Sequence, residues 1–142
     1  SPLREQVQVH VTDDGLLVQI TDDGEDLLFD LSSARLKPAL VEFLQHIGPV
    51  LATMPNTIEV HGHTDARPFP SNAGKTNWEL SFERADVARD LLERSGLREG
   101  QVVGVFAHGA TDLIADPMDA GNRRLAILAR RRAPDPREPE SK

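Results

Sequence analysis

Cysteine is absent from this chain of 142 residues, so neither a disulfide framework nor a thiolate metal site can form. Long apolar runs are missing too, because no stretch approaches the roughly 18 residues that a membrane span needs. The first residues, Ser1-Pro2-Leu3-Arg4-Glu5, are polar and do not resemble a signal peptide. Sixteen basic residues stand against twenty-three acidic ones, and the net charge of −7 excludes a uniform basic surface for nucleic acid or anionic lipid. These absences predict one soluble domain.

The amino-terminal part has the pattern of a β-hairpin. Residues Gln6 to Val11 alternate between apolar and polar side chains, which indicates a half-buried strand. Thr12-Asp13-Asp14-Gly15 is a strong turn signal, and Leu16 to Thr21 has the pattern of the returning strand. Asp22-Asp23-Gly24 turns the chain again before a short apolar run, Leu27-Leu28-Phe29.

Helical periodicity follows this run. One apolar stripe recurs at spacings of three and four and comprises Leu36, Leu40, Phe43, Leu44, Ile47 and Leu51. Ser32 or Ser33 is the expected amino-terminal cap, and Pro38 is tolerable only in the first turn. Gly48-Pro49 is expected to kink or end the helix.

A second helix is predicted from Asn77 to Arg94. Thr76 and Glu79 have the spacing of a capping box, in which each side chain satisfies a free backbone amide of the first turn. Gly96 is the expected carboxy-terminal stop.

Three further strands complete the pattern, at Thr57 to Val60, Gln101 to Ala107 and Leu125 to Ala129. With the short apolar run Leu27-Leu28-Phe29 counted as a strand before the first helix, the order after the hairpin is β-α-β-α-β-β, and the economical arrangement is one sheet with the helices on one face. The predicted fold class is an α+β two-layer sandwich. From Pro134 onward, prolines among charged residues predict a disordered tail.

Three motifs combine acidic and basic groups on rigid elements. Gly62-His63-Thr64-Asp65 ends a strand, Leu80-Ser81-Phe82-Glu83-Arg84-Ala85 lies on the second helix, and Asn122-Arg123-Arg124 precedes the last strand. A carboxylate accepts hydrogen bonds from an ammonium group, and a guanidinium binds a carboxylate in bidentate fashion. The combination predicts a site for a zwitterionic ligand.

The same motifs, in this order and spacing, resemble the signature of the OmpA C-terminal-like domain, a peptidoglycan-binding family. The resemblance covers about residues 27–130. More narrowly, the segment from Phe29 to Pro38 and the sequence Asn77-Trp78-Glu79-Leu80-Ser81 are similar to flagellar stator B subunits.

The resemblance implies a ligand and the residues that hold it. The ligand is the diaminopimelate-containing stem peptide of peptidoglycan, with Asp65 at the ammonium group and Arg84 at the carboxylate. The motif positions that line or support the pocket are Thr64, Leu80, Asn122 and Arg123. Alternation along the strand predicts that the neighbouring Arg124 points elsewhere.

The resemblance also implies an organisation and a role. It divides the chain into an amino-terminal hairpin (1–26), an OmpA-like domain (27–132) and a Pro-rich tail (133–142). The expected role is to anchor a flagellar motor stator to the cell wall from the periplasm, as a homodimer joined to a stator A-type membrane subunit. The membrane helix of such a subunit, with its proton-accepting aspartate, is not in this sequence, so the chain is expected to be a periplasmic fragment of a protein held in the inner membrane.

Other functions remain open on the residues alone. Another wall-anchored envelope protein, such as a Pal-like lipoprotein, would carry the same motifs. A glycosidase needs two facing carboxylates and a zinc amidase needs assembled histidines, and neither set is evident, so no enzyme and no cofactor are predicted. A dimerisation domain with an empty pocket is the third alternative.

Two aromatic features have a functional and a structural interpretation. His61 and His63 share one strand face, a geometry that zinc can use with His108 or Asp65 as a third ligand, but strand histidines are more often structural, so no metal site is predicted. Trp78 suits stacking on a sugar, although anchoring of the first helical turn against the core is the favoured interpretation.

Overall fold

The computed structural model describes residues 3–24, 28–67 and 76–131. Five strands form one sheet in the order β1-β2-β5-β3-β4. Their bounds are β1 Val7–Thr12, β2 Gly15–Thr21, β3 Ile58–His63, β4 Val102–Ala107 and β5 Arg124–Arg130. Only the pairing of β3 with β4 is parallel. Two short 3₁₀ turns, Arg4–Gln6 and Ala120–Asn122, precede β1 and β5.

The predicted hairpin is present and belongs to the main sheet. β1 and β2 pair around the turn at Asp13 and Asp14, and β2 then pairs with β5 over all of its seven residues. The predicted order after the hairpin is β-α-β-α-β-β, but the first helix or strand described after β2 is a helix, so this order is obtained only when β2 itself is counted as its first strand. Leu28 and Phe29, which follow, are buried but form only an isolated bridge between Phe29 and Leu36. The predicted division at residues 26 and 27 stays a prediction, and the predicted tail, 133–142, lies outside the described residues.

Helix α1 spans Pro38–Ala52, and both of its ends differ from the prediction. Its amino-terminal cap is Lys37, with Pro38 as the first helical residue, so the expected caps Ser32 and Ser33 lie before the helix. The helix also continues through Gly48-Pro49 to Ala52. A Cβ at residue 48 would come within 2.9 Å of the Ser95 Cβ, so glycine permits close contact with the end of the second helix.

Helix α2 spans Asn77–Arg94, as predicted. The Thr76 hydroxyl accepts a hydrogen bond from the Glu79 amide at 3.2 Å, which caps the first turn. At the other end the Leu97 amide donates to the Leu92 carbonyl, and Gly96 has a φ of 135°, a conformation that favours glycine.

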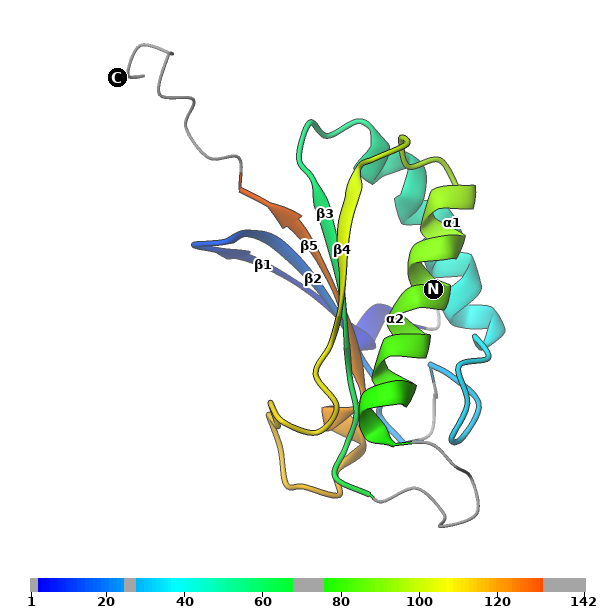
Figure 1. Cartoon of the computed structure of the whole chain (residues 1–142), viewed down its shortest axis with the longest axis vertical. Coiled ribbons are helices and arrows are strands. Elements are labelled where there is room, and N and C mark those ends of the chain that lie inside the picture. The colour runs from blue at the N-terminus through cyan, green and yellow to red at the C-terminus, as the bar shows by residue number, and fades with distance from the viewer. Residues whose placement is uncertain (1–2, 25–27, 68–75, 132–142) are drawn as a thin grey trace.

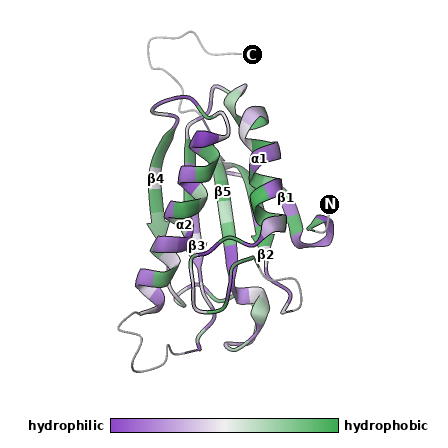
Figure 2. Ribbon diagram, turned by 90° about the vertical axis from the view of Figure 1, so that its right-hand side faces the viewer, coloured by the Kyte–Doolittle hydropathy of each residue, from purple (hydrophilic) through white to green (hydrophobic). Residues whose placement is uncertain are grey.

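The two helices cover one face of the sheet (Figure 1). Buried apolar residues of the sheet and of both helices form the core between the two layers. Hydrophobic and hydrophilic residues alternate along the helix ribbons (Figure 2). β5 is the central strand, and all of its residues except Arg130 are buried. No helix in the described ranges is both long and apolar enough to cross a bilayer.

Candidate functional site

The predicted site lies at the end of the sheet where strands β2 and β3 end and strand β5 begins, beside the first turn of α2 (Figure 1). Arg124 of β5 pairs with Thr21 of β2 on one side and with His63 of β3 on the other. Three charged residues lie within two positions of these paired residues: Asp22 after β2, Arg123 before β5 and Asp65 after β3. Strand register therefore brings together residues from three distant parts of the sequence.

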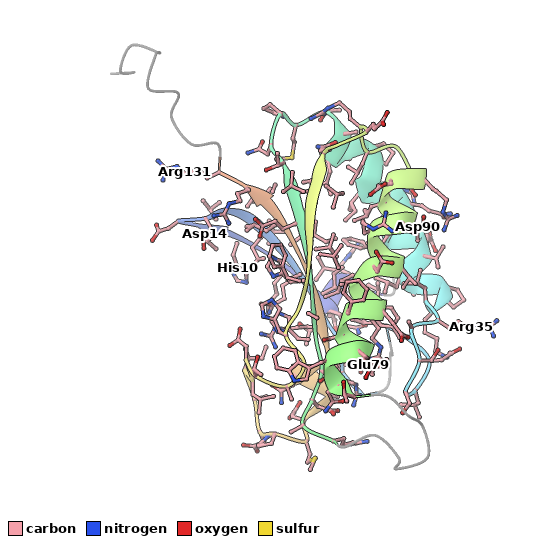
Figure 3. All side chains as sticks on the ribbon, in the orientation of Figure 1. His10, Asp14, Arg35, Glu79, Asp90 and Arg131 are labelled. Carbon is pink, nitrogen blue, oxygen red and sulfur yellow. The ribbon has the colours of Figure 1, made fainter. Side chains whose placement is uncertain are left out.

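Four labelled side chains show how the helices and the hairpin are arranged around the sheet. Glu79 marks the first turn of α2 and Arg35 marks the segment before α1, both on the helical side (Figure 3). His10 and Asp14 lie on the hairpin, which is part of the sheet and projects away from the helices (Figure 3).

Asp65 and Arg123 form a largely buried ion pair, in which the aspartate is buried and the arginine is partly exposed. The Arg123 Nη1 atom donates to Asp65 Oδ2 at 2.7 Å, and its Nη2 atom donates to Asp22 Oδ1 at 3.1 Å. The other oxygen of Asp65 accepts the Arg67 amide at 2.9 Å. Burial alone would lower the pKa of Arg123, but the hydrogen bonds to Asp22 and Asp65 outweigh it and raise the pKa.

Arg84 is held by the segment that precedes α1. Its Nε atom donates to the Ser33 carbonyl at 2.7 Å, its Nη2 atom donates to the Asp30 carbonyl at 3.2 Å, and its guanidinium lies 4.8 Å from the centre of the Phe29 ring. Burial and then the charge of Arg123 lower its pKa to about 10, so it stays charged at neutral pH.

The two residues expected to bind ligand therefore lie in one electrostatic environment. The negative charges of Asp22 and Asp65 act on Arg84 and partly offset the lowering of its pKa. Asp65 is 4% exposed and Arg84 is 7% exposed, so both side chains are shielded from bulk water.

Thr64 directly follows β3, and Leu80 lies in the first turns of α2; both are buried. The Thr64 amide donates to the Gly109 carbonyl at 2.8 Å, while its hydroxyl oxygen is buried without a hydrogen-bond partner in the described part of the chain. Leu80 is buried in the first turns of α2 but does not belong to the main core cluster.

Close contact between β3 and α2 brings the motifs together. A Cβ at residue 62 would overlap the Ser81 carbonyl, so only glycine fits at this position. The Ser81 hydroxyl donates to the Trp78 carbonyl and accepts the Gly109 amide, each at 3.0 Å. No role was predicted from the sequence for the motif positions Gly62 and Ser81. A single sequence does not indicate that the backbones of β3 and α2 come into close contact here.

Asn122 bonds to the loop that precedes β5, and none of the hydrogen bonds of its side chain in the described residues goes to Asp65 or Arg84. Its side-chain oxygen accepts the amides of Ile114 and Ala115 at 2.8 and 2.9 Å, and its nitrogen donates to the Asp116 carbonyl at 2.6 Å. The side chain is fully buried. It therefore fixes the loop before β5 and, through it, the position of Arg123.

Replacing Asn122 by alanine is expected to lower the free energy of unfolding by about 2–3 kcal/mol, because the four backbone groups that its side chain contacts lose their partner at once. Urea denaturation monitored by circular dichroism measures this change. Asn56→Ala is the matched control, since Asn56 makes one exposed hydrogen bond, to the Arg130 carbonyl. Equal losses in the two variants would contradict the supporting role of Asn122.

Arg124 points to the opposite face of the sheet, as alternation predicted. Its Nη2 atom lies 3.2 Å from Asp112 Oδ2, and it shares a depression of about 310 Å³ with His61, His63 and His108. The His61 and His108 rings are joined by a 2.8 Å hydrogen bond, and His63 stacks on His108 at 4.2 Å. No group of three or more histidine, cysteine or acidic residues in the described ranges is arranged to hold a metal ion.

His63 gives the fold a specific pH dependence. Burial, then the charge of Arg124 and the neighbouring imidazoles of His108 and His61, lower its pKa from 6.5 to about 3. The unfolded chain then binds more protons between these values, so stability is complete above about pH 6.5 and falls as the pH falls toward 3.

Between pH 7 and pH 5 this effect is expected to cost about 2 kcal/mol. Urea unfolding across that range should show a shallower pH dependence for His63→Gln than for the unsubstituted chain. His46→Gln is the control, because His46 is exposed on α1. An unchanged slope in His63→Gln would show that another group titrates.

Trp78 is 53% exposed, so the expectation that it anchors the helix in the core is wrong. Its indole ring lies against Gly109, where an added Cβ would come within 3.2 Å. An open surface pocket beside it is lined by Trp78, Glu79, Phe82 and Glu83.

Comparison with known proteins identifies the family of this chain. A model described as the OmpA family matches residues 28–126, which is more than half of the chain. The chain belongs to the OmpA family. The OmpA family match begins after the whole hairpin and after Asp22, so both lie outside its bounds.

Curated relatives of this OmpA family member include motility proteins. Motility protein B of Escherichia coli K12 is 39% identical over 129 residues, covering 89% of this chain and 42% of the relative. Motility protein B of Bacillus subtilis is 28% identical over 131 residues, covering 89% of this chain and 49% of the relative. The chain thus spans less than half the length of these two proteins.

Two solved structures of similar fold cover most of this chain. The periplasmic domain of Helicobacter pylori MotB (residues 90–256) superposes with a TM-score of 0.78 at 24% identity, covering 91% of this chain and 82% of that one. The cell wall anchor of the type VI secretion system (T6SS) from Pseudomonas aeruginosa has a TM-score of 0.75 at 28% identity, with coverage of 89% and 88%. The fold is therefore the α+β sandwich of the MotB periplasmic domains.

Proposed function

We propose that this chain binds peptidoglycan without covalent attachment and anchors a flagellar motor stator to the cell wall. The observation that carries the proposal is the burial of Asp65 and Arg84 beside each other's charges at one sheet edge, on the family's motif positions. The similarity to motility protein B supports the stator role.

Each residue has a distinct part in the proposed complex. Asp65 accepts hydrogen bonds from the ammonium group of the diaminopimelate side chain, and Arg84 donates to its carboxylate. Thr64 offers its unpartnered hydroxyl, and Leu80 contributes apolar surface to the methylene chain of the ligand. Arg123 and Asn122 hold Asp65 and the adjoining loop in place. None of these roles requires a catalytic group, so the protein is proposed to be an anchor and not an enzyme.

The wider assignment follows the stator similarity. The chain would lie in the periplasm, its parent protein would be held in the inner membrane by a helix outside this sequence, and two copies would join a stator A-type subunit. Two weak sites on one dimer raise retention, because the second binding event is intramolecular. An anchor of another envelope complex is the alternative, supported by the fold similarity to the cell wall anchor of the T6SS.

Co-sedimentation with insoluble peptidoglycan tests the binding. The chain is expected to sediment with diaminopimelate-type walls and to be released by a soluble diaminopimelate stem peptide, but to bind lysine-type walls less. Equal retention on both wall types would contradict recognition of the zwitterionic side chain. No retention on either type would overturn the proposed function. Restoration of motility in a stator-deficient strain by a chimaeric stator carrying this domain would separate the stator role from the alternative.

A further inference from the structure

Asp22 is a charged residue of the site that lies outside the region matched by the family. It directly follows β2, six positions before residue 28, where that match begins. Its side chain is 4% exposed although it lies in an Asp-Asp-Gly turn, a position where aspartate is ordinarily exposed. The hairpin therefore delivers a buried carboxylate to a site otherwise built by the rest of the sheet.

The contacts of Asp22 fix one nitrogen of Arg123. Asp22 Oδ1 accepts the Gly24 amide at 2.8 Å as well as Arg123 Nη2 at 3.1 Å, and Oδ2 accepts the Leu28 amide at 3.4 Å. These two amides hold the carboxylate in place. Arg123 is thereby shared between two aspartates, because its Nη1 atom reaches Asp65.

Sharing matters because Arg123 and an ammonium ligand compete for Asp65. In the described structure Arg123 occupies Asp65 Oδ2, which the ligand ammonium would also use. With Asp22 present, the four ionised side chains Asp22, Asp65, Arg84 and Arg123 sum to zero charge. Without Asp22 the sum is +1, and of the two aspartates that Arg123 contacts in the described residues Asp65 alone remains. A positive site disfavours the ammonium and favours the carboxylate of a ligand.

We propose that Asp22 is a positioning residue that sets the ligand selectivity of the site, by holding Arg123 and balancing its charge so that Asp65 stays able to bind an ammonium group. The inference rests on the proposed function. It assigns the hairpin a part in recognition in addition to its place in the sheet.

Three synthetic stem peptides that differ only at the third residue test this role. One carries meso-diaminopimelate, one carries lysine, which lacks the side-chain carboxylate, and one carries 2-aminopimelate, which lacks the side-chain amine. Dissociation constants are measured by calorimetry for the unsubstituted chain, Asp22→Asn and Asp22→Glu. Asp23→Asn, one residue away and exposed, controls for the change in net charge.

In Asp22→Asn, binding of the diaminopimelate and lysine peptides is expected to weaken about tenfold, and binding of the 2-aminopimelate peptide to change less than about twofold. Asp22→Glu should restore most of the selectivity, and Asp23→Asn should keep it. A partly unfolded sample lowers apparent affinity for all peptides equally, so the ratio between peptides remains interpretable.

Equal weakening for all three peptides in Asp22→Asn would show a structural role only and overturn the inference. Unchanged binding would overturn it as well. If the unsubstituted chain binds none of the peptides, the proposed function itself fails, and this inference fails with it.

Discussion

Asp65→Asn is expected to weaken binding of a diaminopimelate stem peptide by at least about 30-fold. The amide keeps the shape of the side chain but removes the charge that pairs with the ligand ammonium. Loss of one partner of a buried, hydrogen-bonded charge pair costs about 2–4 kcal/mol, and each 1.4 kcal/mol is a factor of ten. Calorimetric titration with the soluble peptide measures the change.

Asp112→Asn is the matched control for this substitution. Asp112 also pairs with an arginine, Arg124, but its side chain is 67% exposed and it lies on the opposite face of the sheet. The Asp112→Asn variant is expected to bind the diaminopimelate stem peptide as tightly as the unsubstituted chain. Comparable losses in both variants would mean that overall charge, and not the carboxylate of Asp65, governs binding.

Arg84→Met is expected to remove most of the binding and to lower the free energy of unfolding by about 2–3 kcal/mol. The methionine fills much of the same space but leaves the Ser33 and Asp30 carbonyls without their donor. Arg84→Lys retains the positive charge, so it should regain part of the binding but little of the stability, because one ammonium does not replace the guanidinium fork.

Arg89→Met on the same helix provides the comparison. Arg89 pairs with Asp86 and Glu93 along the outer surface of α2, and such pairs contribute about 0–1 kcal/mol. The Arg89→Met variant is expected to bind the stem peptide as tightly as the unsubstituted chain. If Arg89→Met and Arg84→Met lose binding alike, the loss reflects the helix and not the contact of Arg84 with ligand.

The two helices show where sequence reasoning succeeds. The bounds of α2 were predictable because its signals are local: Thr76 caps the first turn and Gly96 ends the last. The start of α1 was not, because Ser33 is used elsewhere. Its hydroxyl accepts the Arg35 amide, and its carbonyl accepts Arg84. This second contact comes from fifty-one residues away.

Gly48-Pro49 gave a misleading signal for a related reason. In isolation the pair favours a helix end, but in the structure Gly48 is buried against the end of α2. Packing between helices outweighed the local preference, and a single sequence contains no information on that contact.

The motifs of the site could be predicted from the sequence, but the side-chain contacts between them could not. Asp65 and Arg84 were found because they lie on family motif positions, and their assignment to ligand stays a prediction. Asp22 was missed because two adjacent aspartates before a glycine are typical of a turn. Only the pairing of β2 with β5 brings this carboxylate to Arg123.

Trp78 is half exposed and provides an intrinsic fluorescent probe. The chain contains one tryptophan and no tyrosine, so emission excited at long ultraviolet wavelengths comes from this one indole. Next to it, the Asn77 side chain donates to the carbonyls of Asp65 and Arg67. Fluorescence intensity and wavelength therefore report on the first turn of α2, where the helix meets the candidate site, without any attached label.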